Sequence, residues 1–347
     1  MSAPEFDLDY YRARVAALAE RGIYVGTSSW KYEGWVGQIY TASRYEYRGR
    51  LASTRFEREC LREYGETFRT VCVDAAYYTF PEAAKLRELA DQVPDDFRFA
   101  FKTTDEVTVK RFPSLPRFGP RGGTVNENFL NAPLFIERFL GPMEAIRSKV
   151  GPIIIEFSKF YPGDYARGSD FIADLDRFFG ALPKGWPCCV ELRNRKWLGP
   201  DYLACLQRHG VAHVYNNWTD MPSVAEQIGT VGEQRTDALT VARFLLKPGR
   251  KYEEAVLRFK PYTRTQEVND EGRAALAALI ERGWLKPSRV GVFLYINNRL
   301  EGNALLTVLA VLDRLAFLPA PVAKAAATSA PPKPATQPAS PQRDLGL

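Results

Sequence analysis

The stretch Pro152-Ile153-Ile154-Ile155-Glu156-Phe157-Ser158 is a short apolar run, rich in isoleucine, that ends in polar residues. A helical pattern begins near Asp170, and a second run of the same kind follows it, Pro187-Cys188-Cys189-Val190-Glu191-Leu192-Arg193. A strand, a helix and a second strand in this order form a unit whose two strands lie parallel in one sheet. This unit decides the fold, because it recurs along the chain.

The repetition extends from Ile23 to Phe317. We expect strands at Ile23–Ser28, Phe68–Asp74, Phe97–Lys102, Pro152–Ser158, Pro187–Arg193, Val211–Asn216, Leu239–Leu246 and Arg289–Asn297. We expect the helices to begin near Leu51, Pro81, Pro133, Asp170, Gly199, Pro222, Asp270 and Glu301. These repeated units predict an α/β fold, a closed (β/α)8 barrel of the TIM type, with any site at the C-terminal ends of the strands.

The composition favours one large folded domain with an extension at each end. The 347 residues, 46% of them hydrophobic, can bury a single core, and we expect the barrel domain to span 23–318. The pattern from Asp9 to Arg21 predicts an amphipathic helix within an N-terminal extension, 1–22, which could cover the bottom of the barrel. The tail, 319–347, is rich in proline and alanine and has no aromatic residue, so we expect it to be disordered.

The N-terminal residues and the cysteines indicate a compartment. The stretch from Met1 to Asp7 has neither the basic nor the apolar region of a signal peptide. No stretch of the sequence contains the roughly 18 apolar residues that cross a membrane. The 5 cysteines are odd in number and lack CxxC spacing, which favours free thiols in a reducing compartment. We therefore expect a cytoplasmic protein without a membrane partner.

Charged side chains end the central strands of the expected barrel. Period-two alternation puts Glu191 and Arg193 on one face of their strand, and this face is the lumen if Val190 and Leu192 pack under the helices. Glu156 stands at the corresponding height of the preceding strand. The two glutamates should therefore be neighbours, and nearby carboxylates can divide into an acid and a base. An ion pair that only fills the top of the barrel is the alternative.

Other strands contribute further polar groups at the same end. We predict Glu191, Glu156 and Asp74 as catalytic candidates, and Arg193, Lys102, Arg243, Asn297, Asn298, Trp30 and Tyr78 as substrate-binding candidates. Trp30 stands in an aromatic loop after the first strand, where its ring can stack on a ligand or only anchor the loop. Each of the other groups can equally belong to a satisfied polar layer of the barrel interior.

Several kinds of site are excluded or not indicated. The only histidines, His209 and His213, cannot build a multinuclear zinc site of imidazoles, and no metal site is indicated. No dinucleotide, P-loop or nucleophile-elbow motif occurs, so no cofactor is indicated. Arg243 stands where many retaining barrel glycosidases place a carboxylate, which argues against that mechanism.

Basic residues concentrate between Arg243 and Arg264. This segment contains 7 lysines and arginines against 2 glutamates. It follows the seventh strand, a position where barrels often bind phosphate. A small anion or the phosphates of a nucleic acid are therefore its candidate partners.

Motifs in five places, in the same order, resemble the YecE-like family, also called domain of unknown function 72. They are Gly26-Thr27-Ser28-Ser29-Trp30 with Tyr32, Trp35 and Tyr40; Phe68 to Pro81 with Tyr78; Phe97 to Lys102 with Val107-Thr108; Val190-Glu191-Leu192-Arg193 with Trp197; and Tyr295-Ile296-Asn297-Asn298 with Gly302-Asn303-Ala304. The resemblance spans 23–317 and implies a TIM barrel with a strand-end pocket, without an established activity. It also implies a divergent member, because Cys72, Asp74 and Val109 replace a glutamate, an asparagine and a histidine that members of the family carry.

The leading hypothesis is an enzyme that acts on a small, polar, anionic substrate through carboxylate acid/base chemistry, of the hydrolase or lyase type. Glu191 would be the acid or base with Glu156 as its partner, while Arg193 and other cations would hold the negative charge. A barrel that binds or processes nucleic acid through 243–264 is one alternative. A non-catalytic binding protein is another. The sequence does not indicate an oligomeric state.

Overall fold

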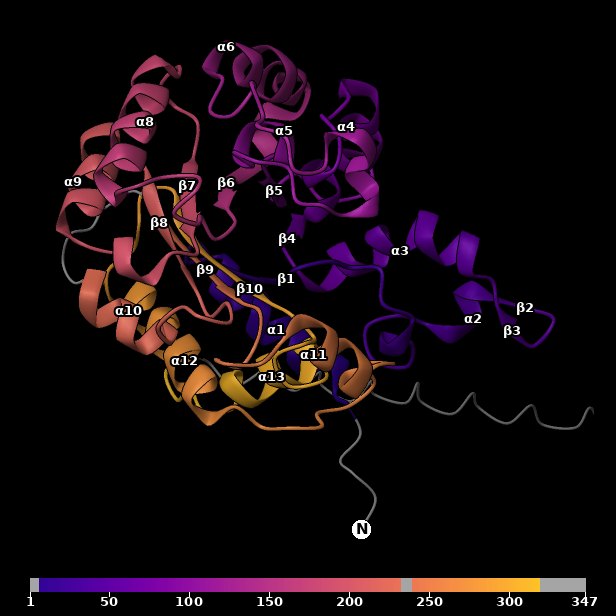
Figure 1. The fold of residues 1–347 in the computed structure, drawn as a ribbon. Coiled ribbons are helices and arrows are strands. Elements are labelled where there is room, and N and C mark those ends of the chain that lie inside the picture. Colours follow the sequence, from indigo (N-terminus) through magenta and orange to yellow (C-terminus); the bar gives the residue numbers. More distant parts are fainter. Residues whose placement is uncertain (1–5, 232–238, 319–347) are drawn as a thin grey trace, which may run out of the picture.

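The structure is a computed structural model that describes residues 6–231 and 239–318 (Figure 1). Its strands close into a barrel in the order β1-β10-β9-β8-β7-β6-β5-β4, and neighbouring strands are parallel. The barrel strands are β1 (Ile23–Thr27), β4 (Thr70–Val73), β5 (Arg98–Lys102), β6 (Val150–Phe157), β7 (Cys188–Leu192), β8 (Ala212–Asn216), β9 (Leu239–Phe244) and β10 (Gly291–Ile296). Each overlaps an expected strand, so the predicted barrel is confirmed.

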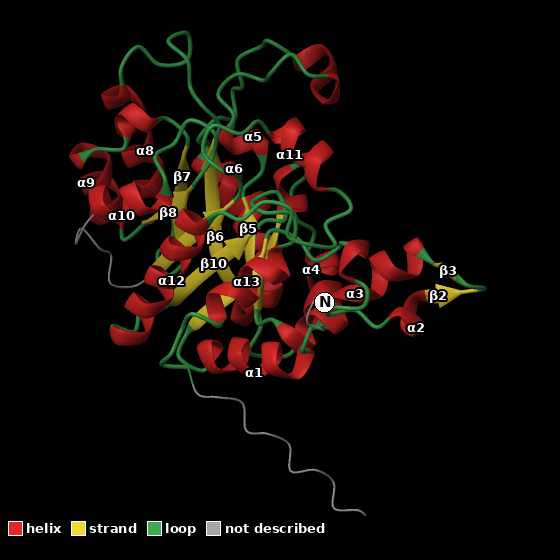
Figure 2. Ribbon diagram, turned by 90° about the horizontal axis from the view of Figure 1, so that it is seen from below, coloured by secondary structure: helices red, strands yellow, loops and turns green. Residues whose placement is uncertain are grey.

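The helices surround the barrel, and the longer ones are α1 (Leu8–Ala19), α3 (Ser53–Thr67), α4 (Ala83–Ala90), α8 (Gly168–Ala181), α9 (Pro200–His209), α10 (Val224–Val231), α11 (Tyr252–Phe259), α12 (Asp270–Leu285) and α13 (Ala304–Leu312). Shorter ones are α2 (Ala42–Tyr45), α5 (Asp105–Thr108), α6 (Ala132–Phe135) and α7 (Gly141–Met143). The helices expected after the strands begin within 3 residues of their predicted starts. A small antiparallel ribbon, β2 (Glu46–Tyr47) with β3 (Arg50–Leu51), was not predicted and projects sideways from the barrel (Figure 2).

Alternating side chains of the strands fill two separate layers. One layer lies inside the barrel and includes Cys72, Ala100, Ile154, Cys189, Val214, Val241 and Tyr295. The residues between them along the strands pack outward against the helices, as Val190, Leu192 and Phe244 do. This alternation, with a period of two residues, also decides which charged side chains face the lumen at the strand ends.

The helix α1 lies at the end of the barrel where the strands begin (Figure 2). Tyr11, Val15 and Leu18 are buried on its inner face. Arg14 donates hydrogen bonds to the carbonyl oxygen of Leu312, the last residue of α13, at 2.6 Å and to that of Leu318, beyond the helix, at 2.8 Å. The N-terminal helix predicted from the sequence is therefore confirmed.

None of the helices in 6–231 and 239–318 has both the length and the apolar character that crossing a bilayer requires. The predicted disordered tail, 319–347, lies outside the described residues.

Candidate functional site

Three acidic and three basic side chains meet inside the C-terminal end of the barrel. They are Asp74 directly after β4, Lys102 at the end of β5, Glu156 on β6, Glu191 on β7, Arg193 directly after β7, and Arg243 on β9. We call these six residues the barrel-end charge network. The register pairs Glu156 with Glu191, so the two glutamates are neighbours on adjacent strands, as the sequence predicted.

Glu156 is the carboxylate with the most cationic partners in the network. One of its oxygens, Oε2, lies 2.8 Å from the ammonium of Lys102, 2.7 Å from Arg193 Nη2 and 3.1 Å from Arg243 Nη1. Burial acts to raise the pKa of Glu156, but attraction to these three cations outweighs burial and lowers the pKa to about 2. Glu156 is therefore ionised at neutral pH and has no proton to donate.

Glu191 and Asp74 complete the network through the two arginines. Arg193 donates from Nε and Nη2 to Glu191 Oε1, at 3.1 and 2.9 Å. Arg243 donates from Nη1 to Glu191 Oε2 at 2.7 Å and from Nη2 to Asp74 Oδ1 at 3.3 Å. Burial acts to lower the pKa of Arg243, but the surrounding acidic groups, Glu191 first among them, raise it well above its usual value. Arg243 is therefore the cation that joins all three carboxylates.

The network has a sealed floor and an accessible rim. The side chains of Glu191, Glu156 and Arg243 are 0, 2 and 3% exposed. Those of Arg193 and Lys102 are 10 and 13% exposed, and that of Asp74 is 41% exposed. A molecule that approaches from solvent therefore meets Asp74, Arg193 and Lys102 before the other three.

Aromatic rings hold the two rim cations. The ammonium of Lys102 lies 3.6 Å from the centre of the Tyr77 ring, and the guanidinium of Arg193 lies 3.9 Å from that of Trp218. Both distances are typical of cation–π contacts, which restrain a cation without neutralising its charge. The sequence analysis missed both rings. The position of Trp218, two residues after β8 ends, is the signal that could have identified it.

The long loop after β5 adds Arg117, which was not among the predicted site residues. Its guanidinium lies 5.3 Å from the centre of the Tyr77 ring and 5.1 Å from that of Tyr78, and it is paired with Asp105 at 3.4 Å. Tyr78, a predicted substrate-binding residue, is 63% exposed beside Tyr77. These residues extend the rim from Lys102 toward the outside of the barrel. The arginines and glycines from Arg117 to Gly123 could wrap an anion, but no helix follows them at P-loop spacing, so the signal in the sequence was weak.

The other predicted binding residues make contacts within loops. Trp30 is 8% exposed in the main core, and the Tyr40 hydroxyl donates a hydrogen bond to its carbonyl oxygen. The side-chain oxygen of Asn298 accepts hydrogen bonds from Trp35 Nε1 and from the backbone N–H of Ala304. Asn297 directly follows β10, and its side-chain oxygen accepts a 2.9 Å hydrogen bond from the backbone N–H of Arg299. These contacts support the structural alternative for Trp30 and Asn298.

Much of the positive charge of the basic segment 243–264 is balanced by nearby carboxylates, including one that lies outside the segment. Arg243 belongs to the barrel-end charge network. Lys247, Arg250 and Arg258 surround Glu267, which lies outside the segment, at 3.0, 2.9 and 2.9 Å. Four of its basic residues are thus paired with carboxylates.

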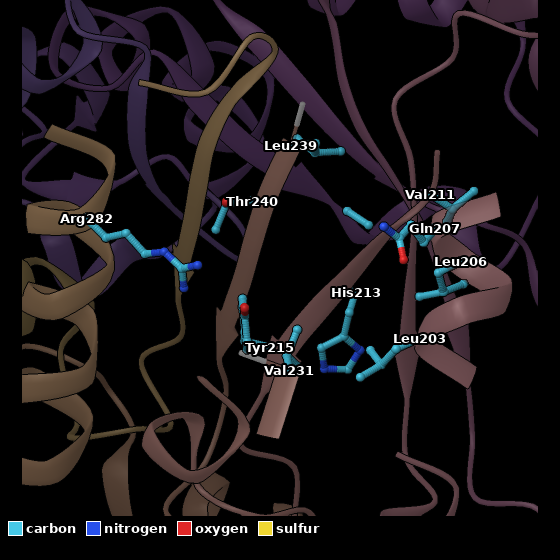
Figure 3. Close-up of a pocket in the computed structure, with 11 residues that line it drawn as sticks. Leu203, Leu206, Gln207, Val211, His213, Tyr215, Val231, Leu239, Thr240 and Arg282 are labelled. Atoms are coloured by element: carbon cyan, nitrogen blue, oxygen red, sulfur yellow. The ribbon is translucent and has the colours of Figure 1, made fainter. Parts of the chain in front are cut away.

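A pocket away from the network lies between β8, β9 and the helices α9, α10 and α12 (Figure 3). Its volume is about 30 Å³, and His213, Thr240 and Arg282 are among its lining residues. Val231 and Leu239 also line it, and they border 232–238, which the structure does not describe. We therefore assign no site to this pocket.

The sequence model of the family DUF72, which is described as 'Protein of unknown function DUF72', matches residues 24–335. A DUF72 family protein from Enterococcus faecalis has a similar structure, with a TM-score of 0.58 and 20% sequence identity, over 84% of this chain and 95% of that chain. A DUF72 family protein from Thermotoga maritima has a TM-score of 0.53 and 20% identity, over 84% of this chain and 98% of that chain. No curated protein matches the sequence. At this identity the two structures show the fold alone.

Proposed function

The chain belongs to the DUF72 family of proteins of unknown function, and we propose that it is an enzyme that binds a small anionic substrate at the rim of the barrel-end charge network. The observation that carries this proposal is the division of the network into rim and floor. Lys102, Arg193 and Asp74 reach solvent, whereas Glu156 and Glu191 are sealed beneath them.

Lys102 and Arg193 are the proposed contacts of the anion. Each has one side against an aromatic ring and shares the carboxylate of Glu156, so both cations are held in place before a ligand arrives. Cations that are already ordered lose little conformational entropy on binding. Because only 10 to 13% of each side chain is exposed, the access suits a carboxylate or phosphate group of a small molecule.

Asp74 is the proposed acid/base group. Its side chain is 41% exposed, and one of its oxygens is oriented by Arg243 at 3.3 Å. Glu156, with its pKa lowered to about 2, is a fixed charge, and the buried Glu191 is closed to a substrate. We therefore give Glu156 and Glu191 the role of positioning Lys102, Arg193 and Arg243, and Asp74 that of transferring a proton to or from the substrate.

The anion-binding part of the proposal is tested by thermal unfolding with inorganic phosphate and a panel of small carboxylates and phosphorylated metabolites. A ligand at 100 times its Kd adds about 2.7 kcal/mol to stability, which shifts Tm by several degrees. The expected result is a shift in the wild type that Lys102→Gln abolishes. Lys149→Gln is the matched control, because Lys149 is also 13% exposed but lies at the opposite end of the barrel. A shift that survives in Lys102→Gln contradicts the proposed contact.

The catalytic part is tested with Asp74→Asn on any compound that binds and is turned over. We expect turnover to fall by a factor of about 10² to 10⁴, as for loss of a general acid or base. Anion binding should persist, because the variant removes a negative charge from the rim. Asp170→Asn is the control, since Asp170 is 39% exposed and paired with Arg167 at 2.9 Å outside the network. Unchanged turnover in Asp74→Asn removes Asp74 from the mechanism, and binding without turnover in the wild type supports the non-catalytic alternative.

Nucleic-acid binding through 243–264 has weaker support, because Glu267 neutralises part of the segment. The salt dependence of affinity separates the two ideas. Several phosphate contacts make affinity fall steeply with salt, whereas one small anion makes it fall gently. A steep dependence observed with oligonucleotides would favour the nucleic-acid alternative.

A further inference from the structure

Three side chains of types that bind metal ions meet on the outside of the barrel, on the helices α8 and α9. Cys205 and His209 lie four residues apart on α9, so they share one face of that helix. Asp176 lies on α8, which packs beside α9 (Figure 1). The thiol sulfur, one imidazole nitrogen and one carboxylate oxygen all lie within 4.8 Å of one another.

We propose that Asp176, Cys205 and His209 form a mononuclear zinc site that joins α8 to α9. The proposal concerns a different part of the molecule from the substrate site and does not depend on it. It also differs from the multinuclear imidazole site that the histidine content excludes.

The distances between the three side chains support a tetrahedral ion. Zinc binds sulfur at about 2.3 Å and nitrogen or oxygen at about 2.0 to 2.2 Å, so ligand atoms around one ion stand roughly 3.3 to 3.6 Å apart. Cys205 Sγ lies 3.7 Å from Asp176 Oδ1, and His209 Nε2 lies 2.9 Å from the same oxygen. The third distance, between Cys205 Sγ and His209 Nε2, is at most 4.8 Å, so these two side chains would have to approach each other by up to about 1.2 Å to bind one zinc ion.

The types of ligand favour zinc over harder cations. Thiolate and imidazole are preferred ligands of zinc, whereas magnesium and calcium prefer oxygen. On binding, the Cys205 thiol would lose its proton to the solvent, so the thiolate and the Asp176 carboxylate would balance the two charges of the ion. Asp176 is 42% exposed and His209 is 15% exposed, so a water molecule can reach the site as the fourth ligand.

Arg208 orients one of the proposed ligands through hydrogen bonds, as residues next to a metal site commonly do. It donates to Asp176 Oδ1 from Nη2 at 2.7 Å and from Nε at 3.3 Å, which orients the carboxylate. Arg208 contacts the same oxygen, Oδ1, that lies nearest to Cys205 and His209, so an ion bound at Oδ1 would require Arg208 to move its contact to Oδ2. Without a metal, the same residues would form an ion-pair cluster at the C-terminal end of α9, where cations are stabilised by the helix dipole.

The proposal is tested on the whole chain, after treatment with a chelator, by titration with Co²⁺ as a spectroscopic probe and then with Zn²⁺. We expect one tightly bound Co²⁺ per chain, with the visible absorption of a tetrahedral ion and a thiolate-to-metal charge-transfer band. Zn²⁺ should displace it and raise Tm. Cys205→Ser should remove the charge-transfer band, and His209→Gln should weaken binding by at least tenfold.

Two controls make the test specific. Cys60→Ser removes another buried helical cysteine, on α3, and should leave the spectrum unchanged. Asp74→Asn alters the proposed substrate site and should also leave it unchanged, so failure of one proposal is distinguishable from failure of the other. The zinc site is overturned if no ion binds, if bound Co²⁺ shows no thiolate band, or if the band persists in Cys205→Ser.

Discussion

At the scale of single residues, His213 shows how burial alters a titratable group. It lies on the outer face of β8 and is 7% exposed. Its two ring nitrogens are 3.2 Å from the Tyr202 hydroxyl and 3.2 Å from Gln227 Oε1. Burial lowers the pKa of His213 to about 4, although Gln227 and Glu191 oppose this shift. The ring is therefore neutral in the folded protein over most of the pH range in which an unfolded chain would protonate it.

This difference predicts an acid-sensitive stability. The unfolded state takes up a proton near pH 6.5 and the folded state near pH 4, so stability falls as the pH drops between these values. Between pH 7 and pH 5, this group alone should cost about 2 kcal/mol. Urea unfolding of the wild type and of His213→Asn at both pH values measures the effect. An equal loss in the two proteins would assign the acid sensitivity to other groups.

At the scale of elements, the barrel closes through a narrow seam between β1 and β4. The strand β1 pairs with β10 over its whole length, from Ile23 to Thr27, but the pairing with β4 is limited to Thr27 and Val71. A Cβ atom at Gly26 would lie 2.3 Å from the carbonyl oxygen of Thr70, so only glycine allows this close approach. Tyr64 of α3 bridges the seam, because its hydroxyl accepts from the Thr27 N–H at 3.1 Å and donates to the Thr70 carbonyl at 3.0 Å.

We therefore predict that Tyr64→Phe weakens the seam. The change leaves the buried Thr27 N–H and Thr70 carbonyl without this partner, which should lower the free energy of unfolding by about 1 to 3 kcal/mol. Hydrogen exchange at the Thr27 amide should accelerate more than exchange in the β1–β10 ladder. Tyr10→Phe, which removes an exposed hydrogen bond to Asp313, is the control. If the free energy of unfolding falls equally in the two variants, the Tyr64 hydroxyl does not stabilise the seam more than an exposed hydrogen bond would.

At the scale of the whole molecule, the barrel-end charge network links strands that are not neighbours. Arg243 on β9 reaches Asp74 after β4, Glu156 on β6 and Glu191 on β7, whereas β9 itself pairs with β8 and β10. These contacts cross the lumen. The carboxylates proposed to position the cations of the site therefore also link distant strands of the barrel through Arg243.

The network should consequently show strong coupling between its members. Arg243→Leu leaves buried carboxylates short of a cation and should cost roughly 3 to 5 kcal/mol in urea unfolding. The double variant Arg243→Leu with Glu191→Leu should cost less than the sum of the single changes, because it removes both charges of a pair. Lys85→Ala, which breaks an exposed pair with Glu82, should leave the stability almost unchanged, because solvent screens such pairs. Additive losses within the network would contradict this account.

The fold could be read from the chain because strand and helix patterns are local. Runs such as Ile153 to Phe157 and the helical patterns between them predicted the barrel. Period-two alternation put Glu191 and Arg193 on one face, and Glu156 was expected beside Glu191 because it stands at the corresponding height of the preceding strand. The α2 helix and the β2–β3 ribbon escaped prediction, since segments this short carry too few residues for a periodic signal.

The alternation along a strand predicts on which face a side chain lies, but it does not predict how far that side chain is from a partner or how exposed it is to solvent. Only the folded barrel shows that Glu191 is sealed while Asp74 is 41% exposed, and that Trp218 lies against Arg193. Likewise, Asp176 and His209 are distant in the sequence, and so are Glu267 and Lys247. Packing of the folded chain brings each pair within hydrogen-bond distance. These features depend on contacts between distant segments, which the local pattern of a sequence does not encode.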